Sequence, residues 1–107
     1  MKKIKSDKDL KDIRTCDIEL ISMNWVNDGR DLELIFLAND VEKSSFLCTW
    51  ANNIKTHFTT NPNEVGCPFT WDITLKENDD NVFEVEFDFA SKGNVSLCCN
   101  ELKYNIF

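Results

Sequence analysis

The single histidine of this chain limits the acid–base chemistry that the sequence can support. A Cys–His or Ser–His nucleophile needs a base within hydrogen-bond reach, and the only histidine that could serve is His57. No Gly-x-Ser-x-Gly sequence occurs, no cysteine is close to His57 in sequence, and the three glycines are too scattered to form a phosphate-binding loop. We therefore predict a protein without enzymatic activity, in which His57 is a surface or half-buried side chain at the end of a strand.

The cysteines have neither the number nor the spacing of a disulfide framework or a zinc site. Five are present, an odd number with no Cys-x-x-Cys pair: Cys16, Cys48, Cys67, Cys98 and Cys99. Cys16, Cys48 and Cys99 occupy alternating apolar positions, which predicts that they face the core as free thiols. Cys67 lies in a predicted loop and is expected to react first. No cofactor and no metal are expected, since the polar run of residues 77–81 also lacks the order of a calcium loop.

Acidic side chains recur with a period of two, which places each set on one face of its strand. The sets are Asp17 and Glu19, then Asp31 and Glu33, and then Glu84, Glu86 and Asp88. Side chains two residues apart on a strand share a face at a spacing of about 6–7 Å, so each set forms a column opposite apolar side chains. If these strands belong to one sheet, its solvent face is strongly negative.

Two explanations of these columns remain open. Acidic residues on an outer face keep a β protein soluble and protect its edges. However, mixed charges would serve solubility equally well, and columns of like charge cost stability. An acidic face that binds a basic partner explains why the charge is one-sided.

The three tryptophans support a different function. Trp25, Trp50 and Trp71, with eight phenylalanines and one tyrosine, have the chemistry to line a pocket for a small molecule or a carbohydrate. All three lie at apolar positions of their strands, which favours packing in the core. Trp25 stands next to the Asn27-Asp28-Gly29 turn, and we expect it to be the one that is partly exposed. It is therefore our candidate aromatic anchor for a protein partner.

The elements that hold these residues are short strands joined by turns. A change of phase near Leu20-Ile21 predicts a β-bulge, and Asn27-Asp28-Gly29 predicts a tight hairpin. The pattern is typical of an all-β fold with one short N-terminal helix, in which an antiparallel meander of seven or eight strands forms a sandwich or a strongly curved sheet. The helix is expected within residues 6–13, and the strands at about 16–25, 31–37, 46–50, 54–58, 69–76, 83–89, 95–99 and 102–106.

Length and charge indicate one acidic domain. Residues 1–107 are expected to form a single domain, with a basic N-terminal segment at 1–13 and a β-rich acidic body at 14–107. Residues 1–14 carry six basic and three acidic side chains, whereas residues 15–107 carry six basic and sixteen acidic ones. Such a body repels phosphate and anionic lipid, so neither nucleic acid nor a membrane is expected as a partner. No membrane span or signal peptide is evident, which favours a cytoplasmic location.

In size, charge and expected location the chain resembles the small acidic inhibitors, or immunity proteins, that bacteria use against basic toxins such as nucleases. No sequence motif carries the resemblance. It implies a protein that covers the basic active-site cleft of a toxin with an acidic surface. We expect a monomer or weak dimer that contacts its basic partner through Asp17, Glu19, Asp31, Glu33, Glu84, Glu86 and Asp88, with Trp25 as the anchor.

Overall fold

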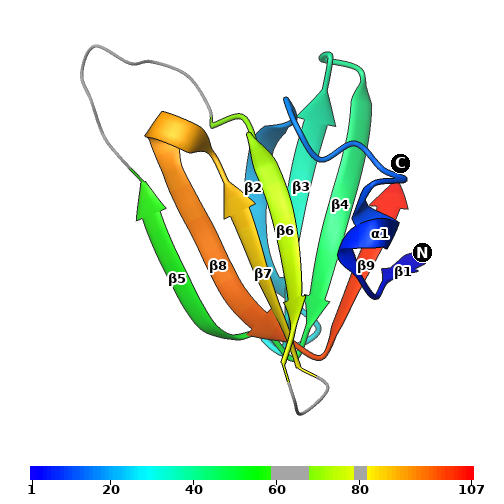
Figure 1. Ribbon diagram of the computed structural model, residues 1–107, viewed down its shortest axis with the longest axis vertical. Helices are drawn as coiled ribbons and strands as arrows, with labels where there is room; N and C mark the ends of the chain where they lie inside the picture. The colour runs from blue at the N-terminus through cyan, green and yellow to red at the C-terminus, as the bar shows by residue number, and fades with distance from the viewer. Residues whose placement is uncertain (59–67, 79–81) are drawn as a thin grey trace.

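Two antiparallel sheets form the protein, which confirms the predicted all-β fold (Figure 1). The computed structural model describes residues 1–58, 68–78 and 82–107. One sheet has five strands in the order β1 (Lys2–Ile4), β9 (Glu101–Ile106), β4 (Glu42–Thr49), β3 (Asp31–Ala38) and β2 (Glu19–Val26). The other sheet has four strands in the order β5 (Asn52–Phe58), β8 (Gly93–Cys99), β7 (Phe83–Asp88) and β6 (Asp72–Glu77).

Each sheet is built around a meander of three consecutive strands, β2–β3–β4 in one and β6–β7–β8 in the other. The hairpin between β2 and β3 turns at Asn27, Asp28 and Gly29, whose φ angles of 55°, 60° and 82° confirm the predicted tight turn. The predicted bulge is also present, because the register of β2 against β3 shifts between Leu20 and Ser22. The described residues contain nine strands rather than seven or eight, and β1 is the strand that the sequence pattern did not predict.

The N-terminal helix is shorter than the predicted 6–13. Helix α1 (Asp7–Leu10) is one turn long, and the Ser6 side chain forms no capping hydrogen bond. The Asp7 carboxylate instead accepts the backbone N–H of Leu75 at 3.0 Å, so the helix is fastened to β6. Nothing in the described part of the chain offers a helix long and apolar enough to cross a membrane.

Aromatic side chains from both sheets meet in the core. The Phe87 ring of β7 lies 5.8 Å from the Phe36 ring of β3 and 5.6 Å from the Phe46 ring of β4, between ring centroids. Tyr104 of β9 adds a contact at 5.1 Å to Phe46. These rings join the two layers, because they come from strands of different sheets.

Two of the three cysteines predicted to face the core do so. Cys48 and Cys99 are fully buried free thiols, as predicted. Cys16 is exposed, so its predicted burial is wrong. It precedes β2 and lies in an irregular segment, where the alternation of a strand does not apply. Cys67 lies outside the described residues.

Candidate protein-interaction surface

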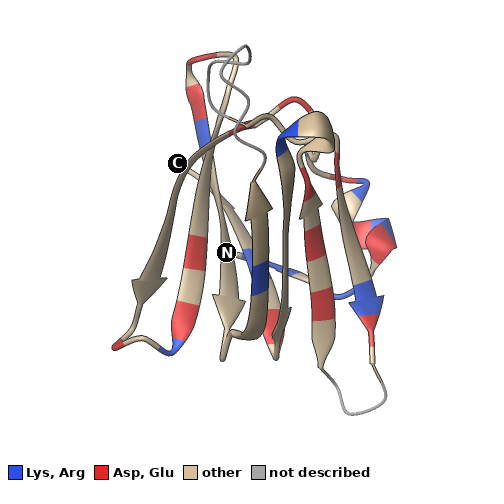
Figure 2. Ribbon diagram, turned by 90° about the vertical axis from the view of Figure 1, so that its left-hand side faces the viewer, with Lys and Arg blue, Asp and Glu red and all other residues tan. Residues whose placement is uncertain are grey.

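The predicted acidic columns do not form one face. Asp31 and Glu33 lie on β3 of the five-stranded sheet, whereas Glu84, Glu86 and Asp88 lie on β7 of the four-stranded sheet. Figure 2 displays the acidic bands of β7 and those of β3 on well-separated strands. Because the two sheets pack through their inner faces, their outer faces point away from each other. The condition under which the columns would form one acidic sheet face, that their strands belong to one sheet, is therefore not met.

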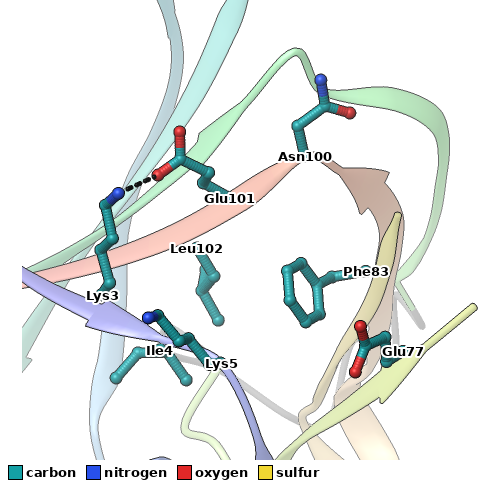
Figure 3. A pocket seen from close by; sticks show the side chains of 8 residues that line it. All are labelled: Lys3, Ile4, Lys5, Glu77, Phe83, Asn100, Glu101 and Leu102. Atoms are coloured by element: carbon teal, nitrogen blue, oxygen red, sulfur yellow. Dashed lines mark ion pairs between the residues drawn. The ribbon is translucent and has the colours of Figure 1, made fainter. Parts of the chain in front are cut away.

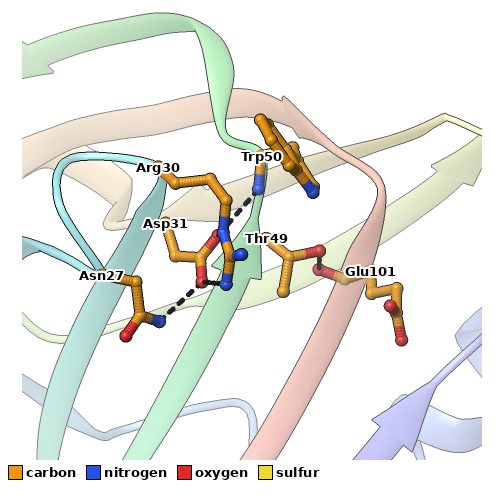
Figure 4. A network of polar contacts seen from close by, with 6 residues as sticks. All are labelled: Asn27, Arg30, Asp31, Thr49, Trp50 and Glu101. Carbon is orange, nitrogen blue, oxygen red and sulfur yellow. Dashed lines mark hydrogen bonds and ion pairs between the residues drawn. The ribbon is translucent and has the colours of Figure 1, made fainter.

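Asp31 is not a surface residue at all. Its carboxylate is fully buried and accepts hydrogen bonds from Asn27 Nδ2 at 2.7 Å, from Arg30 Nε at 2.9 Å and Nη2 at 2.8 Å, and from the Trp50 backbone N–H at 3.0 Å (Figure 4). The hydrogen bonds from Arg30 hold the pKa of Asp31 well below its usual value, although burial opposes them. The charge is neutralised within the protein, which removes Asp31 from the predicted binding residues.

Trp50 and Trp71 are exposed, which contradicts their predicted packing in the core, whereas Trp25 is partly exposed, as predicted. The exposed fractions are 52% for Trp25, 58% for Trp50 and 71% for Trp71. Trp25 points to the inner side of β2, but β2 is the edge strand of its sheet, so neighbours cover it only in part. Trp50 leaves the pattern of β4 because its backbone has a φ of 51°, and the Arg30 guanidinium lies 5.3 Å from its ring centroid.

A long-range pairing carries Asp17 and its neighbours to the start of β6. The Asp17 N–H donates to the Thr70 carbonyl at 2.8 Å, the Thr70 N–H donates to the Ile18 carbonyl at 3.0 Å, and the Leu20 N–H donates to the Pro68 carbonyl at 3.0 Å. Ile18 and Thr70 are each about 1% exposed, so this pairing is part of the packed interior. It links the segment before β2 of the five-stranded sheet to the segment before β6, the edge strand of the four-stranded sheet.

Acidic side chains and an exposed phenylalanine meet on one side of this pairing. Asp17, Glu19 and Asp40 line a hollow of about 300 Å³ together with Phe69, which is 52% exposed. Glu19 and Phe69 are directly opposite each other in a β-bridge. Arg14 also lines the hollow, and its Nε donates to a backbone carbonyl at 3.2 Å. The result is a small acidic depression with an aromatic wall.

A second hollow lies on the other side of Asp17. It has a volume of about 350 Å³ and is lined by Asp17, Asp72, Thr70, Cys16 and the exposed Trp71. Because Asp17 belongs to both hollows, the two are adjacent. Carboxylates beside the face of an indole or phenyl ring form the environment in which a lysine or arginine side chain is held by ion pairing and cation–π attraction.

The acidic residues of β7 extend this region over the outer face of the four-stranded sheet. Asp88 is directly opposite Asp72 of β6, and Glu86 and Glu84 follow along the same face of β7. Lys76 faces Glu84 across the two strands. We call the combined region the acidic surface, and it comprises Asp17, Glu19, Asp40, Phe69, Trp71, Asp72, Glu84, Glu86 and Asp88.

Two carboxylates of the acidic surface are held in place by hydrogen bonds, and none of its carboxylates belongs to an ion pair between described residues. Asp72 accepts the Ile73 N–H and Asp88 accepts the Ala90 N–H, each at 2.8 Å. The ion pairs between described residues are Lys2–Asp12, Lys3–Glu101 and Arg30–Asp31, and none of them includes a member of this surface. Like charges directly opposite on neighbouring strands repel, so the Asp72–Asp88 pair costs stability.

Five of the eight predicted contact residues belong to the acidic surface: Asp17, Glu19, Glu84, Glu86 and Asp88. Glu33 is half-buried on β3, and Trp25 lies near the far end of β2. The residues that the sequence prediction missed are Asp40, Phe69, Trp71 and Asp72. Trp71 was expected in the core and Phe69 at the start of a strand, but β6 begins only at Asp72, so the alternation does not extend to them.

The other side chains that could take part in catalysis or metal binding do not lie together. His57 is exposed on β5, as predicted, opposite Asn94 of β8. Within residues 1–58, 68–78 and 82–107, no three His, Cys, Asp or Glu side chains are grouped so that they could hold a metal ion. A separate hollow of about 420 Å³ lies between β1, β9 and the ends of β6 and β7 (Figure 3). Of its two lysines, Lys3 and Lys5, Lys3 is already paired with Glu101 at 3.0 Å.

No protein-family model matches this chain, and no curated protein is similar enough to count as a relative.

Proposed function

We propose that this protein is a non-enzymatic inhibitor or immunity protein that binds a basic protein, such as a nuclease toxin, and covers its active-site cleft with the acidic surface. The observation that carries the proposal is that four carboxylates (Asp17, Glu19, Asp40 and Asp72) and two exposed aromatic rings line two adjacent hollows at the Asp17–Thr70 pairing. The carboxylates of β7 continue from Asp88, which lies opposite Asp72. Carboxylates steer a basic partner and speed its association. Trp71 and Phe69 then replace Trp25 as the aromatic anchors of the interface.

A protein partner explains the charge of the acidic surface better than solubility alone does. Asp72 and Asp88 repel each other, and none of the ion pairs between described residues compensates for this cost. Lysine or arginine side chains of a partner would relieve the repulsion on binding. The same charges disfavour nucleic acid and anionic membrane as ligands.

The alternative, a tryptophan-lined pocket for a small molecule or a carbohydrate, has weaker support. Trp71 lies beside Asp17 near the start of β2, whereas Trp25 lies near its end. Trp50 contacts Arg30 in the hairpin after β2. Of the three hollows described above, only the one between Asp17 and Asp72 is lined by a tryptophan, and that tryptophan is Trp71 alone.

The test compares variants that remove equal charge from different places. The site variant is Asp17→Asn/Asp72→Asn, and the matched control is Asp28→Asn/Glu77→Gln, which alters exposed acids outside the acidic surface. Tagged proteins are used to capture basic proteins from lysate at low and high salt, and the captured protein is then purified for titration and activity assays.

We expect the site variant to bind the purified partner at least about tenfold more weakly, with a flatter dependence on salt, and the control to bind within about threefold of the wild type. Trp71→Ala should weaken binding at both salt concentrations. Equal weakening by the two double variants would mean that only net charge matters. A partner whose activity is not inhibited would contradict the proposed role as an inhibitor.

A further inference from the structure

Two buried thiols face each other across the interior of the sandwich. Cys48 belongs to β4 of the five-stranded sheet and Cys99 to β8 of the four-stranded sheet, and both are 0% exposed. The neighbouring Cys99 thiol and burial together raise the pKa of the Cys48 thiol. Neither thiol takes part in the proposed interaction surface.

Backbone contacts bring the strands of these two cysteines together. The Asn100 N–H donates to the Thr49 carbonyl at 2.9 Å, so the residues that follow the two cysteines are joined directly. Three residues after Cys99, the chain has turned into β9, where Leu102 pairs with Cys48. This short connection brings the two strands together at the cysteines, and a disulfide requires such proximity because its Cα atoms are usually about 4.4–6.8 Å apart.

The other cysteines are placed differently. Cys98 lies on the outer face of β8, opposite Glu84 of β7, and therefore points away from Cys99. Cys16 is exposed ahead of β2. Of the cysteines that the structure describes, Cys48 and Cys99 are thus the pair whose side chains meet.

We propose that Cys48 and Cys99 form a disulfide that joins the two sheets when the protein meets a low-molecular-weight disulfide such as oxidised glutathione. One cysteine thiolate attacks the glutathione disulfide and releases one molecule of glutathione. The second cysteine thiolate then attacks the protein sulfur of the mixed disulfide and releases the other. Two protein thiols are oxidised, one glutathione disulfide is reduced, and the two protons end on the two glutathione thiols.

Burial of both thiols determines when this reaction takes place. A thiol with no exposed surface reaches an external disulfide only when its strand opens or while the chain folds. The bond, once formed, closes a loop of about 50 residues and ties β4 to β8. We therefore expect slow oxidation of the folded protein, fast oxidation during refolding, and a rise in the melting temperature of roughly 10–20 °C.

The test uses a variant that keeps only this pair of cysteines, Cys16→Ser/Cys67→Ser/Cys98→Ser. It is unfolded in denaturant and refolded with either a mixture of reduced and oxidised glutathione or a reducing agent alone. We expect the first sample to lose two hydrogen masses, to yield a linked peptide that contains Cys48 and Cys99, and to melt at the higher temperature. The same variant with Cys99→Ala is the control, and its melting temperature should not respond to glutathione disulfide.

Two results would overturn the proposal. One is a variant that regains the native circular dichroism spectrum in the presence of oxidised glutathione without the Cys48–Cys99 link. The other is a linked protein that melts at or below the temperature of the reduced form. If the triple variant does not fold, alkylation and peptide mapping of the refolded wild-type protein decide the question. The Cys48–Cys99 disulfide must then be more abundant than any disulfide that involves Cys98.

Discussion

Replacement of Asp31 by asparagine should destabilise the protein markedly, because a buried carboxylate holds the end of the β2–β3 hairpin to the Trp50 backbone. The carboxylate accepts four hydrogen bonds of 2.7–3.0 Å. Two come from Arg30, whose side chain is 44% exposed and regains water after the change, so their loss costs little. The donors of Asn27 and Trp50 lose a charged acceptor, and we expect the free energy of unfolding to fall by about 2–3 kcal/mol.

The dependence on pH provides a second test of the same network. The pKa of folded Asp31 is lower than its ordinary value of 3.8, so its stabilising contribution is complete above that value and is lost as the pH falls toward the folded pKa. The difference between wild type and Asp31→Asn should therefore stay constant from neutral pH to about pH 5 and shrink below about pH 4.

Urea denaturation followed by tryptophan fluorescence at several pH values measures both effects. Glu33→Gln is the matched control, because Glu33 is the next residue on the same face of β3 and is only half-buried. We expect it to alter the free energy of unfolding by less than about 0.5 kcal/mol. An Asp31→Asn protein as stable as the wild type would refute the reasoning, as would a difference that vanishes already near neutral pH.

Three further changes test the core, a close backbone contact and the acidic surface. Gly93→Ala should lower the free energy of unfolding by at least about 3 kcal/mol, because its Cβ would stand 1.8 Å from the His57 carbonyl oxygen and residue 93 has a φ of +126°. A melting temperature near that of the wild type would contradict this. Phe87→Ala should cost about 3–5 kcal/mol in urea denaturation because it opens the aromatic cluster, and a loss below about 1 kcal/mol would show that other contacts dominate. Asp72→Asn should stabilise the protein by roughly 0.2–1 kcal/mol at low salt, because it removes the repulsion from Asp88, and by less at high salt. Destabilisation at low salt would contradict this.

The period-two pattern predicted the strands well where they are central and regular. In β7 and β8 the inward-facing positions Val85, Phe87, Val95 and Leu97 are buried, and Phe83 at the start of β7 is partly buried. These strands have neighbours on both sides in the four-stranded sheet, so one face is covered along its whole length. There the choice between apolar and polar residues reflects burial directly.

The same pattern failed where a strand ends or the backbone leaves the extended region. Trp50 follows Phe46 and Cys48 in alternation, but its positive φ turns the chain out of β4. Trp71 alternates with Ile73, yet it lies outside β6 at a position that neighbours do not cover. A local pattern contains no information on where the covering layer stops, so exposure at such positions cannot be predicted from it.

The candidate site was only half predictable for a related reason. The acidic columns of β7 could be read from the alternation of Glu84, Glu86 and Asp88. Residues 17–20 pair with residues 68–70, which lie about fifty positions away in the sequence, and no local sequence pattern predicts this pairing. That pairing is what brings Asp17 and Asp72 to the same hollow.

The opposite responses expected of Asp31 and Asp72 separate two kinds of carboxylate in this protein. Asp31 is buried and saturated by internal donors, so its removal should cost stability. Asp72 faces another carboxylate and belongs to none of the ion pairs between described residues, so its neutralisation should increase stability. A side chain that lowers the stability of the free protein is retained when it contributes elsewhere, and the basic partner that we propose would provide that contribution. An Asp72→Asn protein that is more stable than the wild type but binds the captured partner equally tightly would contradict the proposed role of the acidic surface in binding.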